Sequence, residues 1–80
     1  MGAEKSAKLL KISQAARAAG VSTQTLEYYI MLGLINPINP PGTRRRLFDD
    51  ALIKRIRLIR ELNETGYTLR DIRTTWLRRK

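Results

Sequence analysis

Two short helical segments separated by only two residues place the tightest constraint on how this chain can fold. The first segment, residues 13–19, is rich in alanine and ends at Gly20, because glycine readily adopts the left-handed conformation that ends a helix. Only Val21 lies between this glycine and Ser22, whose side chain can cap a second helix. Two helices joined by so short a turn must cross steeply, which is the outline of a helix-turn-helix.

The second helix, expected over residues 22–32 with Gly33 as its stop, has two distinct faces. At a period of 3.6 residues, Leu26, Tyr29 and Ile30 share one face, which predicts the core side of the helix. The opposite face carries Gln24, Glu27, Tyr28 and Met31. We therefore expect this opposite face to be available for a partner.

The segment over residues 34–48 loses the helical period. It contains all three prolines of the chain and one glycine, namely Pro37, Pro40, Pro41 and Gly42. Proline cannot donate a ladder hydrogen bond and is confined to sheet edges, so the segment predicts a two-stranded hairpin with a stiff tip. The returning arm of this hairpin carries three consecutive arginines, Arg44, Arg45 and Arg46.

Two more helices are expected after the hairpin. Asp49 can cap a third helix that ends at about Asn63, and Thr68 can cap a fourth. Their core-facing residues at helical spacing are Leu52, Ile56 and Ile59, then Leu69, Ile72 and Trp76. The pattern predicts one mainly α domain over residues 9–80, with four helices and a two-stranded hairpin, after a flexible leader over residues 1–8.

The formal net charge of +9 is unevenly distributed along the chain. Residues 1–43 carry a net charge of +2 and residues 44–80 carry +7. Such an excess favours a phosphate-rich partner or an anionic membrane, and the second half is the expected electrostatic footprint. The alternative is a merely solvated surface, because charged residues also keep small domains soluble.

The chain contains neither cysteine nor histidine, so it can form no disulfide and cannot assemble the usual zinc or nucleophile-base sites. We predict that it is not an enzyme and has no catalytic residues, metal or cofactor. No apolar stretch approaches the roughly 20 residues of a membrane span, and the N-terminus lacks the apolar core of a signal peptide. A cytoplasmic protein without a membrane partner is expected.

Individual residues along the chain also match a known pattern. They are Ile12, Ser13, Gln14, Ala15, Ala16, Ala19, Gly20, Val21, Ser22, Thr25, Leu26, Tyr28, Tyr29, Leu32, Gly33, Leu34, Ile35, Pro37, Arg46, Phe48, Gly66, Tyr67, Thr68, Leu69 and Ile72. In this order, over residues 11–77, they resemble the DNA-binding domain of the MerR family of bacterial transcription regulators. The resemblance implies a winged helix-turn-helix fold and a homodimer acting on a palindromic operator. Within the family, the chain is most similar to the HspR type of heat-shock repressor.

The sequence departs from the family's pattern in several places. Glu27 stands where a basic residue commonly precedes the tyrosine pair, and Ile30 stands where an acidic residue commonly follows it. The hairpin is also longer, which puts the alignment of Arg44 and Arg45 in doubt. The sequence ends at Lys80, before the long dimerisation helix and effector domain of the family's larger members.

The candidate DNA contacts form two sets. Base contacts are expected where helix-turn-helix proteins usually reach base edges, at Thr23, Gln24 and Thr25. A glutamine there can bind adenine through two hydrogen bonds, although all three residues are also ordinary in a first helical turn. Backbone contacts are expected from Arg17, Tyr28, Arg44, Arg45 and Arg46, a role that the resemblance also implies for Tyr28. The basic face of the third helix is expected to add phosphate contacts through Lys54, Arg55, Arg57 and Arg60.

Glu27 leaves three interpretations open. Its carboxylate can accept a hydrogen bond from cytosine N4, pair with a nearby arginine such as Arg17, or repel phosphate. The intramolecular pair is the simplest of the three.

The sequence therefore predicts a sequence-specific transcriptional regulator of MerR or HspR type that binds double-stranded DNA and is associated with the nucleoid, and the resemblance implies a homodimer on DNA. Two alternatives stay open. An excisionase-like or architectural factor needs only a small basic DNA-binding domain. A docking module for an acidic protein or a membrane surface would use the basic face and Trp76.

Overall fold

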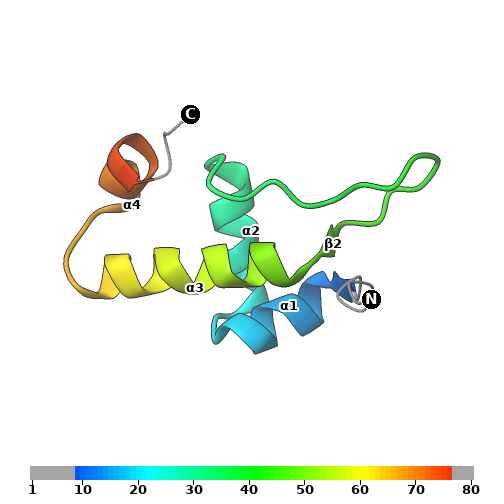
Figure 1. Ribbon diagram of the computed structural model, residues 1–80, viewed down its shortest axis with the longest axis horizontal. Coiled ribbons are helices and arrows are strands. Elements are labelled where there is room, and N and C mark those ends of the chain that lie inside the picture. The colour runs from blue at the N-terminus through cyan, green and yellow to red at the C-terminus, as the bar shows by residue number, and fades with distance from the viewer. Residues whose placement is uncertain (1–8, 77–80) are drawn as a thin grey trace, which may run out of the picture.

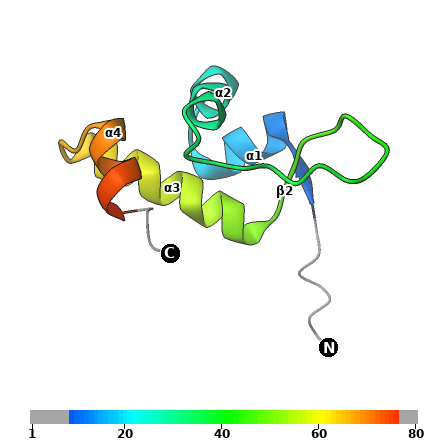
Figure 2. The same cartoon turned by 90° about the horizontal axis from the view of Figure 1, so that it is seen from above.

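Helix α3 forms the long axis of the molecule in this computed structural model, which describes residues 9–76 and the side chains of residues 9–75. The elements follow in the order β1 (Leu10–Lys11), α1 (Ile12–Ala19), α2 (Thr23–Met31), β2 (Leu47–Phe48), α3 (Asp50–Glu64), α4 (Leu69–Asp71) and the π-helical segment η2 (Ile72–Trp76). Figure 2 shows α1 and α2 on one side of α3, and both views show α4 near the far end of α3 and the loop before β2 extending from its near end (Figures 1 and 2). The leader expected over residues 1–8 and the side chain of Trp76 lie outside the described part.

The turn between α1 and α2 follows the local signals in the sequence. Gly20 adopts φ +78°, and the Val21 N–H donates to the carbonyl oxygen of Ala16 at 3.0 Å, which ends α1. Ser22 Oγ then accepts a hydrogen bond from the Thr25 N–H at 3.0 Å, which caps α2. The helix-turn-helix and the expected extent of its second helix are therefore confirmed.

The first helix begins one residue earlier than its expected start at Ser13. Lys11 is its N-cap, and the side-chain oxygen of Gln14 accepts the Lys11 N–H at 3.0 Å. Lys11 is extended because it also belongs to β1, so the change from strand to helix falls at Ile12. Ser13 consequently lies inside the helix and does not cap it.

The core lies between α3 and the helix-turn-helix. Its buried residues are Ala15, Ala16, Ala19, Leu26, Tyr29, Leu34, Ile35, Phe48, Ile53, Ile56, Ile59 and Ile72. The tyrosine pair divides as expected, because Tyr29 is 4% exposed and Tyr28 is 47% exposed. Burial also raises the pKa of Tyr29 above its ordinary value. In α3 the buried stripe includes Ile53, and Leu52, which was expected there, is only half-buried against the core.

The fold class is confirmed as mainly helical with a two-stranded antiparallel sheet, but the strands of that sheet differ from the expected hairpin. β1 pairs with β2 through Leu10 opposite Phe48 and Lys11 opposite Leu47. The outgoing arm of the hairpin contributes one bridge, in which Ile38 and Leu47 exchange hydrogen bonds of 2.8 and 2.9 Å. Pro40, two residues after Ile38, has no N–H to donate at the next hydrogen-bonded position, so the outgoing arm cannot extend the ladder towards the tip.

The fourth helix begins where the sequence indicates, since Thr68 Oγ1 accepts the Asp71 N–H at 3.0 Å. It forms one turn, α4, and then continues as η2, from which Ile72 is fully buried in the core. Within residues 9–76, no helix is both long enough and apolar enough to cross a membrane.

Two serine-to-alanine variants test the helix starts. Ser22→Ala should lower the free energy of unfolding by about 1 kcal/mol, because it removes the cap of α2. The matched control Ser13→Ala should leave stability unchanged or slightly higher, because alanine is the better residue inside a helix. Urea unfolding followed by circular dichroism measures both, and equal losses would contradict the observed start of α1.

Candidate nucleic-acid interface

The outward face of α2 forms a shallow hollow of about 350 Å³. It is lined by Gln24, Glu27, Tyr28 and Met31, the four residues that the helical period placed opposite the core. Their side chains offer an amide, a carboxylate, a hydroxyl and a thioether, so the face can donate and accept hydrogen bonds. This arrangement suits recognition of another polar surface.

The three expected base-contacting residues are not equally available. Thr23 and Gln24 are exposed in the first turn of α2. Thr25 is half-buried, and its Oγ1 accepts a hydrogen bond from Ser22 Oγ at 2.9 Å. Thr25 also lines a separate hollow with Tyr29 of the core face. The structure therefore presents Gln24 in the outward hollow and directs Thr25 towards the helix start.

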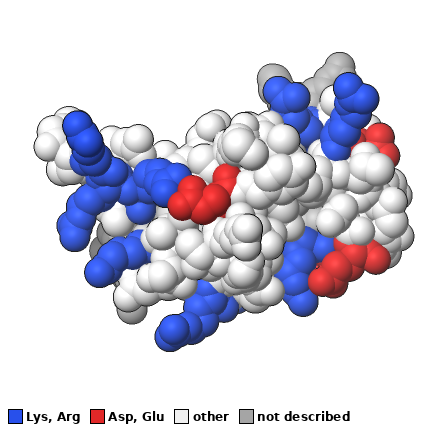
Figure 3. Space-filling model, turned by 180° about the vertical axis from the view of Figure 1, so that it is seen from behind, with Lys and Arg blue, Asp and Glu red and all other residues white. Residues whose placement is uncertain are grey.

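Basic side chains lie at both ends of the face that carries α2. Figure 3 shows a blue group at the end of the loop, another at the opposite upper edge near α4, further blue groups along the lower edge, and mostly neutral surface in the centre, with a red acidic patch touching the loop's basic side chains. The charge excess of the second half of the sequence is thus separated into distinct clusters on the surface.

The first cluster lies on the loop over residues 39–46, which we call the wing. Its tip is a turn in which the Thr43 N–H donates to the Pro40 carbonyl oxygen at 3.3 Å, with Gly42 at φ +81°. Thr43 Oγ1 also accepts the Arg45 N–H at 3.2 Å, so the turn holds the start of the returning arm. Arg44 is exposed, as is Arg45, and we call these two residues the wing cluster.

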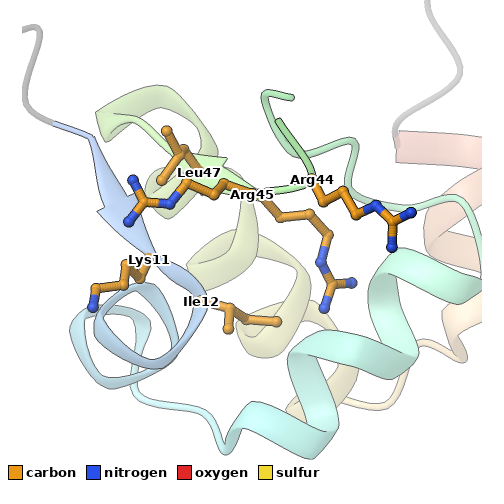
Figure 4. Close-up of a pocket in the computed structure, with 6 residues that line it drawn as sticks. Lys11, Ile12, Arg44, Arg45 and Leu47 are labelled. Atoms are coloured by element: carbon orange, nitrogen blue, oxygen red, sulfur yellow. The ribbon is translucent and has the colours of Figure 1, made fainter. Parts of the chain in front are cut away.

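The wing cluster borders an open hollow of about 260 Å³ that is also lined by Lys11 and Ile12. Figure 4 shows Arg44 and Arg45 extending from the returning arm, with Lys11 of β1 and Ile12 of α1 across the hollow. Because β1 pairs with β2, the strand that was not expected brings a further cation, Lys11, to the wing.

Arg46 differs from its two neighbours because it pairs with Glu27 of α2. Its Nη1 donates to Glu27 Oε1 at 3.0 Å and its Nη2 donates to Oε2 at 2.9 Å. The hydrogen bonds from Arg46 lower the pKa of the Glu27 carboxyl below its ordinary value, and the same bonds raise the pKa of Arg46. The intramolecular pair expected for Glu27 is present, but its partner is Arg46 rather than Arg17, which lies exposed in the last turn of α1.

The basic residues of α3 are mostly engaged within the protein. Arg57 donates through Nε and Nη2 to the Ala18 carbonyl oxygen at 3.3 and 2.9 Å, and Arg55 Nε donates to that of Leu34 at 3.0 Å. Arg60 pairs with Glu64 one turn later, at 3.3 Å. Arg55 and Arg57, which were expected to contact phosphate, thus hold the exit of α2 and the end of α1 against α3, whereas the pair of Arg60 stays within α3.

A second exposed cluster of arginines was not predicted from the sequence. Arg70 of α4 and Arg73 of η2 line a hollow of about 260 Å³ with Tyr28, Leu32 and Leu69, and we call these two arginines the α4 cluster. Because these two arginines are three residues apart on the fourth helix, the sequence could have indicated that they share one face. Only the fold shows that this helix lies beside α2. Tyr28 lines both this hollow and the outward hollow of α2.

The functional groups of this surface suit recognition of a partner. Its functional groups are guanidinium, hydroxyl and amide groups, with one carboxylate that is already paired. Among the described residues, no group of three acidic side chains lies together in a way that could hold a metal ion. Two cationic clusters on either side of a polar helix face suit a partner with two parallel lines of negative charge.

Comparison with known proteins gives one consistent answer. The sequence profile of the MerR HTH family regulatory proteins matches residues 10–77. The chain is 36% identical over 64 residues to the HTH-type transcriptional regulator YyaN of Bacillus subtilis, covering 80% of this chain and 46% of YyaN. It is 34% identical over 70 residues to the mercuric resistance operon regulatory protein of Serratia marcescens, covering 86% of this chain and 48% of that protein.

A solved structure also resembles this one. It is that of HiNmlR, a MerR family regulator lacking the sensor domain, bound to promoter DNA. The TM-score is 0.75 with 28% sequence identity, and the match covers 84% of this chain and 51% of HiNmlR. The chain thus spans about half the length of these similar proteins. The closer likeness to HspR stays a prediction.

The pair between Glu27 and Arg46 predicts a measurable change in pKa. Arg46→Gln should raise the pKa of Glu27 towards its ordinary value, because the carboxylate loses its charged hydrogen-bond donors. Carbon-detected NMR titration of side-chain carboxyl groups measures this shift, and Arg45→Gln is the control that should leave it unchanged. Since the folded-state pKa is lowered, the pair stabilises the fold at neutral pH, and this contribution is lost as the pH falls through that pKa. An unchanged Glu27 pKa in the Arg46 variant would contradict the pair.

Proposed function

Because the chain belongs to the MerR family of HTH regulatory proteins, we propose that it regulates transcription by binding a specific sequence of promoter DNA. The observation that carries this proposal is the exposed polar face of α2, with the wing cluster on one side and the α4 cluster on the other. The length of α2, its polar side chains and the positive charge on either side of it all support the proposal.

The dimensions of α2 suit the major groove. Its nine residues span about 14 Å, and the groove of B-DNA is wide enough to admit one α-helix. With α2 in the groove, Thr23 and Gln24 in its first turn are the residues best placed to reach base edges. Gln24 would then select adenine through its amide group.

The two clusters would bind phosphates on either side of the groove. Arg44 and Arg45 approach from the wing, and Arg70 and Arg73 approach from the fourth helix, with the Tyr28 hydroxyl nearby. Such contacts fix the position of the helix without reading sequence. The likeness to HiNmlR, a regulator bound to promoter DNA, supports a promoter as the target.

Family membership also supports binding as a homodimer to a palindromic operator, with each copy placing one α2 in the groove. A regulator of this kind would work in the cytoplasm, on the DNA of the nucleoid.

Selection from a random duplex library at defined salt tests the function. We expect one enriched motif, with two related half-sites if the protein binds as a dimer. Transcription in vitro from a promoter carrying that motif then measures regulation. If no motif is enriched, sequence-specific regulation is wrong, and equal affinity for random duplex DNA and for anionic vesicles would favour a basic docking surface instead.

The wing cluster should contribute affinity that does not depend on sequence. Arg45→Gln should weaken binding to all duplexes and reduce the slope of log affinity against log salt by about 0.9, as expected for one lost phosphate contact. Arg45→Lys keeps the positive charge and should leave the slope unchanged. Fluorescence anisotropy over a series of salt concentrations measures both slopes, and equal slopes for Arg45→Gln and the unaltered protein would remove this contact.

Gln24 should instead affect which bases are preferred. Gln24→Ala should remove about 1–3 kcal/mol of discrimination at one base pair of the selected motif and leave the salt slope unchanged. Repeating the selection with this variant measures the change, and Arg45→Gln is the contrasting variant because it should keep the motif intact. An unaltered motif for Gln24→Ala would place the base contacts elsewhere on α2.

A further inference from the structure

Glu27 occupies a position on α2 where a negative charge is unfavourable for binding DNA. It lies one helical turn after Gln24, lines the same outward hollow, and its side chain is 47% exposed. An isolated carboxylate there would face the negative potential of two phosphate strands. A charge placed at the centre of the groove face therefore needs a neutralising partner.

Arg46 is that partner, and its geometry is specific. The guanidinium meets the carboxylate in a two-bond fork of 3.0 and 2.9 Å, so the pair is neutral overall and fixed in orientation. Arg46 itself is held because the next residue, Leu47, exchanges two backbone hydrogen bonds with Ile38. The pairing of Ile38 with Leu47, at the base of the wing, thus sets where the Glu27 carboxylate points.

The fork leaves part of the carboxylate available. An ionised carboxylate has about four lone-pair positions on its two oxygens, and Arg46 occupies one on each. The remaining positions can only accept hydrogen bonds, because the Arg46 bonds keep the group ionised. A base edge opposite Glu27 must therefore supply a donor.

Few groups in the major groove supply one. Guanine presents O6 and N7 and thymine presents O4, which are all acceptors that a carboxylate would repel. Adenine presents its N6 amino group beside the acceptor N7, whereas cytosine presents its N4 amino group without an adjacent acceptor. Cytosine is the base that best matches a fixed carboxylate.

Resting on the DNA-binding function proposed above, we propose that Glu27 is a specificity-determining residue that accepts a hydrogen bond from cytosine N4, with Arg46 as its positioning residue. Under this proposal the wing acts on sequence recognition through the fork, in addition to its contacts with phosphate.

The test compares motifs selected from a random duplex library by the unaltered protein and by Glu27→Gln. The unaltered protein should prefer cytosine over guanine at one position by roughly 5- to 150-fold, the usual range for one direct contact. Glu27→Gln should lose most of that preference while the rest of the motif stays the same, because the amide can also donate. Glu61→Gln, the same change on α3, should keep the preference.

Arg46→Lys tests the positioning role because it keeps the charge and removes the fork. It should reduce the cytosine preference while leaving the salt slope unchanged. If Glu27→Gln instead lowers affinity for all sequences equally and alters no position of the motif, Glu27 only anchors the wing and the proposal is wrong. If Arg46→Lys keeps the full preference, Arg46 has no positioning role. Absence of any motif for the unaltered protein would overturn the proposed function itself, which is a different result.

Discussion

The arrangement of this protein depends on how the carbonyl oxygens at the short turn between α1 and α2 find hydrogen-bond donors. The last carbonyl oxygens of a helix have no partners within that helix, and Arg57 of α3 donates two hydrogen bonds to one of them, that of Ala18. Arg55 Nε donates one hydrogen bond to the carbonyl oxygen of Leu34, after α2. These contacts tie the end of α1 and the exit from α2 to α3, which fixes the face that α2 turns to solvent. The outward hollow of α2 follows from this fixed geometry.

Local signals explain why most helices could be predicted from the sequence. Ser22, Asp49 and Thr68 each cap a helix through a bond to the backbone three residues later, and such bonds depend on neighbouring residues alone. The division between Tyr28 and Tyr29 follows from the helical period in the same way. Boundaries of this kind need no knowledge of the tertiary fold.

The contacts that were missed all join residues distant in sequence. The sequence predicts an intramolecular pair for Glu27, with Arg17 as an example of its partner, but its actual partner is Arg46, nineteen positions away. The two residues of β1 carry no periodic signal, and their strand exists because β2 is beside it. Net charge does not show which arginines are available to a partner. Arg55 and Arg57 donate to carbonyl groups within the protein, whereas Arg70 and Arg73 line a surface hollow beside Tyr28. The fold decides which cations are structural and which are available.

Pro37, just before the wing, affects whether copies of the protein can pair through their sheet edges at high concentration. Because Pro37, whose backbone nitrogen faces outward next to the bridge at Ile38, has no N–H, the outer edge of the small sheet offers few amide donors to a strand from another molecule. Edges with continuous donors and acceptors template aggregation. The interrupted edge lets an arginine-rich loop project from the molecule without becoming a site of self-association.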